Sequence, residues 1–128
     1  YNANPGSFRG VLQSIRFIHP KIPLIAVIGP MAELGENAEQ FHKEVGEFIY
    51  DSGCKKLLVL GGDLGESYLE GWKNAGGPKE DAKRFESLEE LQNDFQQDWD
   101  QKSIVLVKGS RSAAMERFVK AILNHESE

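Results

Sequence analysis

The stretch at residues 103–117 reads SIVLVKGSRSAAMER and contains a complete strand–turn–helix transition. The aliphatic run 104–107 predicts a buried strand, which the polar turn 108–111 ends. After the turn, apolar side chains recur at the spacing of one helix face: Met115, Phe118, Val119, Ile122 and Leu123. Because a helix N-terminus presents unpaired N–H groups and the positive end of its dipole, this turn favours an anion. An exposed turn carrying ordinary surface charges fits the same residues, so the turn alone leaves both interpretations open.

The composition indicates a single globular domain. The chain has 128 residues, of which 40% are hydrophobic and 27% charged, enough to bury a normal core. A net charge of −5 argues against general nucleic-acid binding. A single cysteine, Cys54, excludes an internal disulfide, and we interpret it as a small side chain near a strand start. No apolar run approaches the ~20 residues of a membrane span, and the chain shows no signal-peptide pattern. Because the chain opens at Tyr1 without Met, we also expect a fragment of a longer protein.

Helical and extended patterns alternate along the chain. Short aliphatic runs predict strands at 24–29, 57–60 and 104–107, with a short edge strand at 82–85. Helical spacing predicts helices at 7–18, at 37–50, around Leu64, Tyr68 and Trp72, at 87–99, and after the turn 108–111. Ser87 and Glu90 have the spacing of a capping box.

This alternation predicts an α/β fold. Strands separated by helices indicate βαβ units, and strands without polar alternation are buried on both faces of a mostly parallel sheet. Right-handed crossovers then give a three-layer domain. Ligands of such sheets bind beyond the carboxyl ends of the strands. Three segments converge on that edge, namely 29–35, 61–65 and 108–111, so we expect the functional site there.

Three separate motifs give the chain a family resemblance. They read YNANP at 1–5, MAELGENAEQFHKEVG at 31–46 and VKGSRSAAME at 107–116. In this order and spacing, the chain resembles the C-terminal domain of the Mur ligases from end to end. The resemblance implies a Rossmann-like domain spanning 1–128, with 1–5 as the remnant of an interdomain hinge. It also implies a monomeric, three-domain enzyme of peptidoglycan synthesis in the bacterial cytoplasm, and hence a role in cell shape and cell division.

The activity that the resemblance implies is an ATP-dependent amide-bond ligation. Within the family, the chain resembles the members that join D-alanyl-D-alanine to UDP-N-acetylmuramoyl-tripeptide. In that family, other domains hold the UDP-sugar, most of the ATP and the Mg²⁺. The chain contains no G-x-x-x-x-G-K-[ST] motif. We therefore expect no cofactor in the isolated domain and no activity from it alone.

The resemblance also assigns site residues. Substrate-binding residues would be Lys108, Ser110 and Arg111 of the KGSR turn, with Glu33, Leu34, Gly35 and His42 from the segment after the first strand. Tyr1, Asn2 and Asn4 match the hinge segment near the adenine and ribose of ATP. Arg111 is the preferred partner of a carboxylate or phosphate, because a guanidinium binds such groups bidentately. Pro30 stands where the family has an aspartate, so any hydrogen bond of that carboxylate is lost.

Other interpretations of these residues stay open. His42 fits a half-buried structural histidine, and Asn4-Pro5 fits a simple helix start. The turn Gly61-Gly62-Asp63-Leu64-Gly65 fits a tight turn or a phosphate site, although it lacks the G-x-G-x-x-G spacing. The three histidines, His19, His42 and His125, lack the spacing of metal ligands, so we predict no metal site. The chain as a whole also fits a non-catalytic module that binds a small ligand or a nucleotide.

Overall fold

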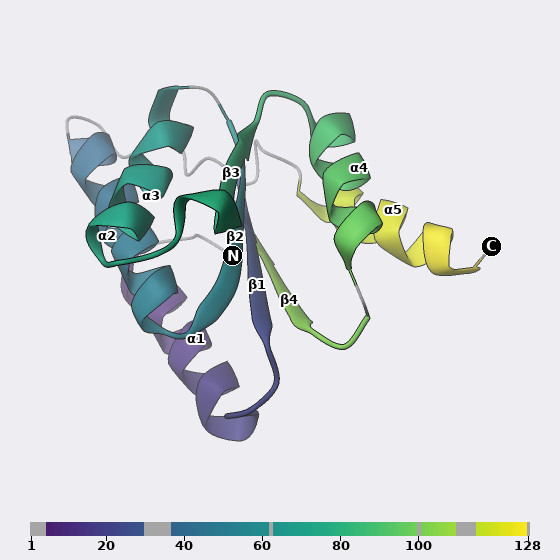
Figure 1. The fold of residues 1–128 in the computed structure, drawn as a ribbon, viewed down its shortest axis with the longest axis horizontal. Helices are drawn as coiled ribbons and strands as arrows, with labels where there is room; N and C mark the ends of the chain where they lie inside the picture. Colours follow the sequence, from purple (N-terminus) through teal and green to yellow (C-terminus); the bar gives the residue numbers. More distant parts are fainter. Residues whose placement is uncertain (1–4, 30–36, 62, 100, 110–114, 128) are drawn as a thin grey trace.

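The computed structural model describes residues 5–29, 37–61, 63–99, 101–109 and 115–127. Helices and strands alternate along them, as the pattern predicted (Figure 1). The elements are α1 (Pro5–Ile18), β1 (Leu24–Ile28), α2 (Ala38–Asp51), β2 (Cys54–Leu60), α3 (Asp63–Asn74), a 3₁₀ turn (Lys79–Asp81), β3 (Ala82–Phe85), α4 (Leu88–Asp98), β4 (Ile104–Lys108) and α5 (Glu116–Ser127).

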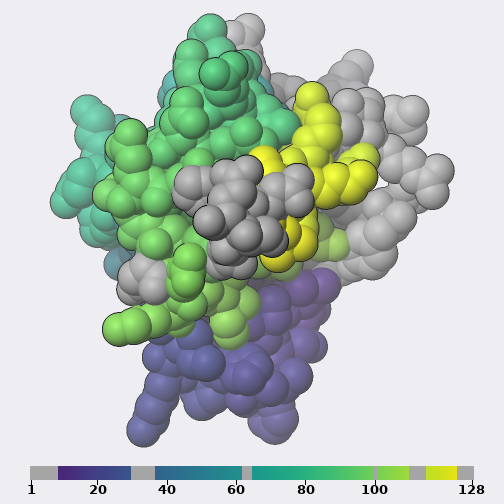
Figure 2. All heavy atoms as spheres, turned by 90° about the vertical axis from the view of Figure 1, so that its right-hand side faces the viewer, coloured from purple at the N-terminus to yellow at the C-terminus, as the bar shows by residue number. Residues whose placement is uncertain are grey.

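The four strands form one parallel sheet in the order β3-β2-β1-β4. Helices α1, α2 and α3 lie on one side of the sheet, and α4 and α5 lie on the other (Figure 1). From the side of the second layer, α4 and α5 are seen next to each other (Figure 2). The predicted three-layer α/β fold with a parallel sheet is therefore confirmed.

Helices cover the sheet on both faces, and β1 in its interior is buried throughout, which explains why that strand lacks polar alternation. Strand β4 was predicted to be buried, but all of its residues are half-buried, because it lies at the edge of the sheet. Leu24, Ala26 and Ile28 of β1 pack into a core shared with α1, α2 and α3. Ile25 and Val27 of the same strand face the other way and pack with residues of α4 and α5. Each successive β1 side chain thus enters the opposite core, and all five are buried.

Strand β2 begins earlier than predicted. The apolar run starts at Leu57, but the strand starts at Cys54, where it pairs with Leu24 of β1. The prediction stopped short because Lys55 and Lys56 interrupt the apolar pattern. They lie at the amino end of the sheet, where Lys56 reaches Asp98 of α4 at 3.7 Å and Lys55 is exposed. Cys54 lies at the strand start, as interpreted, and is buried. Burial raises the pKa of its thiol to about 12, so the thiol is uncharged.

Other local signals were correct. Helix α1 begins at Pro5, two residues before the predicted start, and so fits the alternative in which Asn4-Pro5 starts a helix. The Ser87 side chain accepts a hydrogen bond from the Glu90 N–H at 3.2 Å, which is one half of the predicted capping box. Helix α3, predicted around Leu64, Tyr68 and Trp72, runs from Asp63 to Asn74 and ends just before the residues Gly76-Gly77-Pro78.

A single arginine binds the carboxyl ends of two helices. The Arg16 guanidinium, near the end of α1, donates to the carbonyls of Ser52 and Gly53, which follow α2, both at 3.1 Å. It also donates to carbonyls in the segment after α1: His19, Pro20 and Ile22. Helix ends leave carbonyls without intrahelical partners, and a cation there also opposes the negative end of the helix dipole. Arg16 thereby fixes α1 against α2 at the amino end of the sheet.

Candidate functional site

The carboxyl ends of the central strands lie side by side, as expected for the site. Ile28, the last residue of β1, pairs with Lys108 of β4 and with Val59 of β2. Beyond the strand end, the Gly29 N–H donates to the Lys108 carbonyl at 2.6 Å. The described parts of all three predicted segments therefore meet at one edge of the sheet (Figure 1).

Tyr68 of α3 reaches this edge from one side. The side chain is fully buried, and its hydroxyl donates to the Gly29 carbonyl at 3.4 Å. Burial raises the pKa of the Tyr68 hydroxyl well above its ordinary value of 10, so the hydroxyl stays protonated and remains a donor at neutral pH. The sequence indicated only that Tyr68 lies on the apolar face of a helix.

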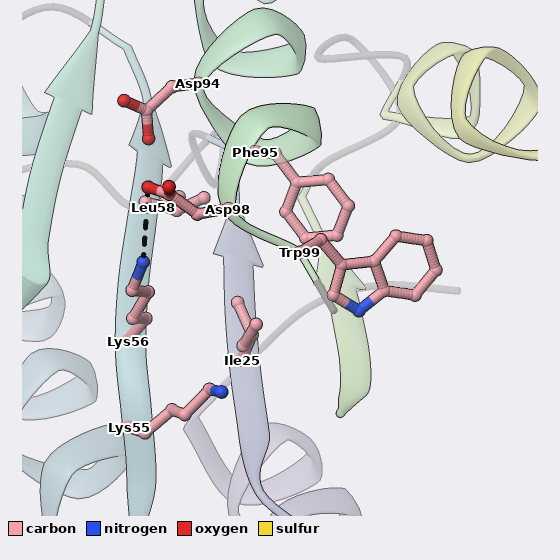
Figure 3. A pocket seen from close by; sticks show the side chains of 8 residues that line it. All are labelled: Ile25, Lys55, Lys56, Leu58, Asp94, Phe95, Asp98 and Trp99. Carbon is pink, nitrogen blue, oxygen red and sulfur yellow. Dashed lines mark ion pairs between the residues drawn. The ribbon is translucent and has the colours of Figure 1, made fainter. Parts of the chain in front are cut away.

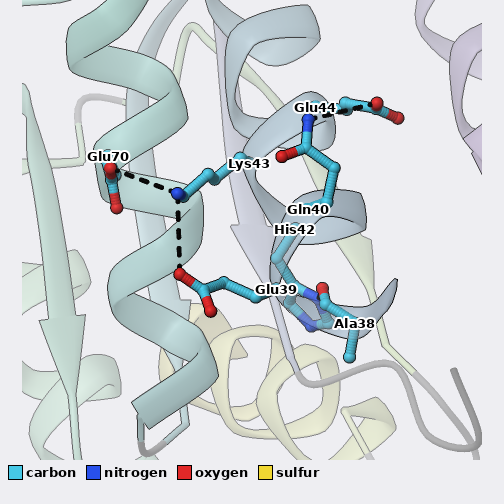
Figure 4. A network of polar contacts seen from close by, with 7 residues as sticks. All are labelled: Ala38, Glu39, Gln40, His42, Lys43, Glu44 and Glu70. Carbon is cyan, nitrogen blue, oxygen red and sulfur yellow. Dashed lines mark hydrogen bonds and ion pairs between the residues drawn. The ribbon is translucent and has the colours of Figure 1, made fainter. Parts of the chain in front are cut away.

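His42 lies behind Tyr68, on α2. Its ring is fully buried and packs edge-on against the Tyr68 ring, with centroids 4.4 Å apart. The ring Nδ1 bonds to the Ala38 carbonyl one turn earlier (Figure 4). Because a carbonyl can only accept, Nδ1 carries the proton and Nε2 carries the free lone pair. Desolvation lowers the pKa of His42, and the bond to Ala38 opposes this only in part, so the ring is neutral at physiological pH.

The burial of His42 bears on its predicted role. Its Nε2 is inaccessible and has no hydrogen-bond partner among the residues that the structure describes. The charged groups of the same region stay on the surface, where Lys43 lies 3.5 Å from Glu39 and 3.3 Å from Glu70 of α3 (Figure 4). The structural interpretation of His42 is thus the one its surroundings favour, although it is more deeply buried than expected.

Arg84 of β3 reaches the turn that follows β2. Its Nη1 donates to the Gly61 carbonyl at 3.1 Å, and its Nε donates to Glu66 of α3 at 2.8 Å. The Glu86 carboxylate lies 3.6 Å from Arg84 Nη1. The Glu66 hydrogen bond and, to a lesser extent, both carboxylate charges raise the pKa of Arg84. Sequence reasoning did not select Arg84, because a single arginine in a short edge strand has the pattern of a surface charge.

The other predicted site residues divide into two groups. Lys108 ends β4 at the carboxyl edge, where it is half-buried, and it lies across the edge from Gly29. Outside the described residues lie Ser110 and Arg111, Glu33, Leu34 and Gly35, Pro30, and Tyr1, Asn2 and Asn4. Of the predicted set, the structure therefore places Lys108 at the edge and His42 in the layer of side chains behind it.

A small cavity lies at the opposite end of the sheet, between α4 and the first residues of β1 and β2 (Figure 3). Phe95 and Trp99 line one side of it, and the ion pair of Lys56 with Asp98 lines the other (Figure 3). Its volume of about 20 Å³ is enough for a water molecule but not for a peptide or a nucleotide. This cavity is therefore separate from the carboxyl edge and does not compete with it as a substrate site.

Two further features of the described residues limit the possible kinds of site. No cluster of three or more His, Cys, Asp or Glu side chains in the described part of the chain has an arrangement suited to a metal ion. None of the described helices combines the length and the apolar character needed to cross a membrane.

The chain is similar to known ligases over most of its length. It is 34% identical over 125 residues to the UDP-N-acetylmuramoyl-tripeptide--D-alanyl-D-alanine ligase of Escherichia coli, covering 95% of this chain and 25% of that protein. It is 29% identical over 119 residues to the ligase of the same name from Rickettsia prowazekii, covering 93% of this chain and 25% of that protein. The chain thus spans about a quarter of the length of these relatives.

Solved structures lead to the same group. The fold superimposes on a crystal structure of MurF from Acinetobacter baumannii with a TM-score of 0.77 and 26% identity, over 97% of this chain and 27% of that one. It also matches the MurF ligase of Thermotoga maritima, a structure in complex with ADP, with a TM-score of 0.72, 24% identity and coverage of 94% and 26%. The family model described as "Mur ligase, glutamate ligase domain" matches residues 1–111. Together with the parallel α/β fold, this match over most of the chain shows that the protein belongs to the Mur ligase family and that the chain corresponds to the glutamate ligase domain of that family.

Proposed function

We propose that this chain is the C-terminal domain of an ATP-dependent ligase that joins D-alanyl-D-alanine to UDP-N-acetylmuramoyl-tripeptide in the bacterial cytoplasm. The observation that carries the proposal is the extent of similarity: 91–96% of the chain aligns with about a quarter of each of several ligases of that name. The carboxyl edge of the sheet is where such a fold places a ligand. Residues 1–5 would be the end of the hinge that joins this domain to the rest of the enzyme.

The proposed reaction divides the work between domains. ATP transfers its γ-phosphoryl group to the carboxylate of the tripeptide, giving an acyl phosphate and ADP. The amine of the dipeptide then attacks the acyl carbon, forming the amide and releasing phosphate. The chain has no P-loop sequence, so ATP and Mg²⁺ would be held mainly by another domain. The contribution of this domain is to bind and orient the incoming dipeptide.

Specific residues would carry that contribution. We assign Lys108, Ser110 and Arg111 to an anionic group, either the dipeptide carboxylate or a phosphate of the activated substrate. Glu33, Leu34, Gly35 and His42 would shape the dipeptide site, with buried His42 acting from behind and not by direct contact. Tyr1, Asn2 and Asn4 would lie near the adenine and ribose of ATP. The half-buried place of Lys108 at the carboxyl edge supports the first of these assignments.

The test is ligation by the full-length protein that contains this chain. With ATP, Mg²⁺, UDP-N-acetylmuramoyl-tripeptide and D-alanyl-D-alanine, phosphate release should depend on both peptide substrates, and mass spectrometry should detect the pentapeptide product. Replacing D-alanyl-D-alanine by single amino acids tests the dipeptide assignment. Ligation of a single amino acid instead of the dipeptide would assign the protein to another branch of the family. If ATP or NAD bound to this domain without any ligation, the nucleotide-binding module would replace the proposal.

A further inference from the structure

Side chains bind the two glycines at which the central strands leave the sheet. Gly29 follows β1, and its carbonyl accepts a hydrogen bond from the Tyr68 hydroxyl at 3.4 Å. Gly61 follows β2, and its carbonyl accepts a hydrogen bond from Arg84 Nη1 at 3.1 Å. Tyr68 comes from α3 and Arg84 from β3, so two neighbouring elements act on two successive strand exits.

The N–H groups of the same glycines are bound as well. The Gly29 N–H donates to the Lys108 carbonyl at 2.6 Å, and the Gly61 N–H donates to the Phe85 carbonyl at 3.1 Å. Each glycine is therefore fixed through both of its backbone groups, by a neighbouring strand on one side and by a side chain on the other. A shift of either exit would break at least one of these bonds. At Gly61 the φ angle is +152°, which few other residues adopt, so a glycine suits this exit.

Both donors are held in place by their own surroundings. The Tyr68 ring is fully buried and packs against the buried His42 ring at 4.4 Å. The aliphatic part of Arg84 passes over Gly65, where an added Cβ would lie only 2.9 Å from Arg84 Cδ. Its Nε is fixed by Glu66 at 2.8 Å. The two donors are therefore preorganised and do not depend on a ligand for their position.

We propose that Tyr68 and Arg84 are positioning residues of the ligation site, which fix the carboxyl edge at Gly29 and Gly61 and, through Gly29, the place of Lys108. This inference rests on the proposed function. Neither side chain needs to touch the dipeptide, since each acts on backbone groups at the edge. Misplacing a reacting group by about 1 Å can cost on the order of 100-fold in rate or binding. Loosening one backbone carbonyl should therefore be visible in substrate binding.

The experiment compares four substitutions in the full-length protein: one at Tyr68, two at Arg84 and one control. Tyr68→Phe removes only the hydroxyl, and Arg84→Met removes the donors but keeps a stem to cover Gly65. The control is Trp72→Phe, which also deletes a donor of α3, because Trp72 Nε1 donates to the Pro78 carbonyl at 2.8 Å, close to the end of the helix remote from the edge. Steady-state kinetics with D-alanyl-D-alanine as the varied substrate, and thermal unfolding, are measured for each.

The expected results separate positioning from simple stability. The loss of one typical hydrogen bond at the edge corresponds to a change in KM of about threefold to tenfold. We therefore expect KM to rise by this factor in Tyr68→Phe and in Arg84→Met, while kcat stays within about twofold of wild type. Trp72→Phe should lower the unfolding temperature but leave KM unchanged, since less folded enzyme reduces the apparent kcat and not KM. Arg84→Lys should show a smaller rise in KM than Arg84→Met but should not reach the wild-type KM, because an ammonium cannot bind Gly61 and Glu66 together as a planar guanidinium does.

Hydrogen exchange gives a readout that does not depend on activity. The Gly29 amide should exchange at least several-fold faster in Tyr68→Phe, and the Gly61 amide in Arg84→Met, while Trp72→Phe leaves both unchanged. Unchanged exchange at both glycines would overturn the inference, even in a protein that turned out not to ligate. Faster exchange with unchanged KM in an active enzyme would show that the two side chains stabilise the fold without positioning the substrate. A wild-type protein without ligation would end the proposed function, and the exchange rates would still decide the hydrogen-bonding part of the inference.

Discussion

Arg111 is the residue on which the proposed contact with an anion depends most. A guanidinium meets a carboxylate or a phosphate with two parallel hydrogen bonds, which an ammonium cannot match. In the full-length protein, Arg111→Ala should lower kcat/KM for D-alanyl-D-alanine by about 10- to 100-fold, since a hydrogen bond to a charged group is typically worth ~1.5–3 kcal/mol. Arg111→Lys should recover part of this. Lys120→Ala, at an exposed position on α5, is the control and should leave the kinetics unchanged. Equal kinetics for Arg111→Ala and wild type would remove this turn from the site.

His42 makes stability depend on pH in a predictable direction. Its folded-state pKa is lowered, mainly by burial. As the pH falls below 7, the His42 ring therefore binds a proton in the unfolded chain before it does so in the folded protein. The free energy of unfolding should therefore be highest above the unfolded-state pKa of His42, near 6.5, and should decrease as the pH drops through and below that pKa. His42→Asn keeps a donor for the Ala38 carbonyl but cannot titrate, so denaturation midpoints measured from pH 7.5 to 5 should decline less steeply. A wild-type slope in His42→Asn would contradict the burial argument.

At the scale of elements, α2 and α3 approach so closely that each needs a glycine. A Cβ at Gly46 of α2 would overlap the Tyr68 carbonyl of α3, and one at Gly71 of α3 would overlap the Lys43 carbonyl of α2. Because both obstacles are backbone, they cannot rotate away. Gly46→Ala and Gly71→Ala should each destabilise the protein by about 1–3 kcal/mol or more, as overpacking does.

A third glycine supplies the matched control for this contact. Gly10 lies inside α1 with nothing within 4 Å of an added Cβ. Gly10→Ala should therefore stabilise the protein by roughly 0.5–1 kcal/mol through helix propensity. Urea denaturation of the three variants measures these differences. A stabilising Gly46→Ala would show that the helices can separate without cost.

At the scale of the whole molecule, the chain should fold as one cooperative unit without any other domain. Its two cores lie on opposite faces of one sheet, and each is closed by helices of this chain. Trp72 belongs to one core, and Trp99 packs against the other. The variants Trp72→Phe and Trp99→Phe each leave one fluorescent reporter, on opposite sides of the sheet. In each variant, urea unfolding followed by fluorescence and by circular dichroism should give one shared midpoint. Separate midpoints in either variant would indicate that one layer unfolds on its own.

The isolated chain should also be inactive and should bind the dipeptide weakly. It carries no P-loop sequence to hold the phosphates of ATP, and we propose that the cleft is shared with another domain. Part of the contact surface would be absent, while association still costs translational and rotational entropy. We expect no phosphate release from the fragment, and calorimetry should find no sub-micromolar binding of D-alanyl-D-alanine. Tight binding by the fragment would instead favour a self-sufficient binding module.

The sequence by itself determined the alternation of strands and helices along the chain, the parallel sheet between two layers of helices, and the sheet edge at which three segments converge. These features follow from local periodicity and from the absence of polar alternation, as in 24–28 and 104–107. Both signals can be recognised within a few neighbouring residues of the sequence. The motifs also determined the family, because three short patterns in fixed order are more specific than any one of them. The start of β2 was placed wrongly where two lysines interrupted its local pattern.

Only the tertiary structure decided what holds the edge in place. Tyr68 reaches a carbonyl 39 positions away in the sequence, and Arg84 reaches one 23 positions away. Nothing near either residue in the sequence marks that partner, since a tyrosine on an apolar helix face and an arginine in an edge strand have the patterns of core and surface. The full burial of His42 and the need for glycine at Gly46 and Gly71 arise in the same way. Contacts between distant segments depend on how helices pack on the sheet, and that packing is fixed by the whole set of apolar faces together.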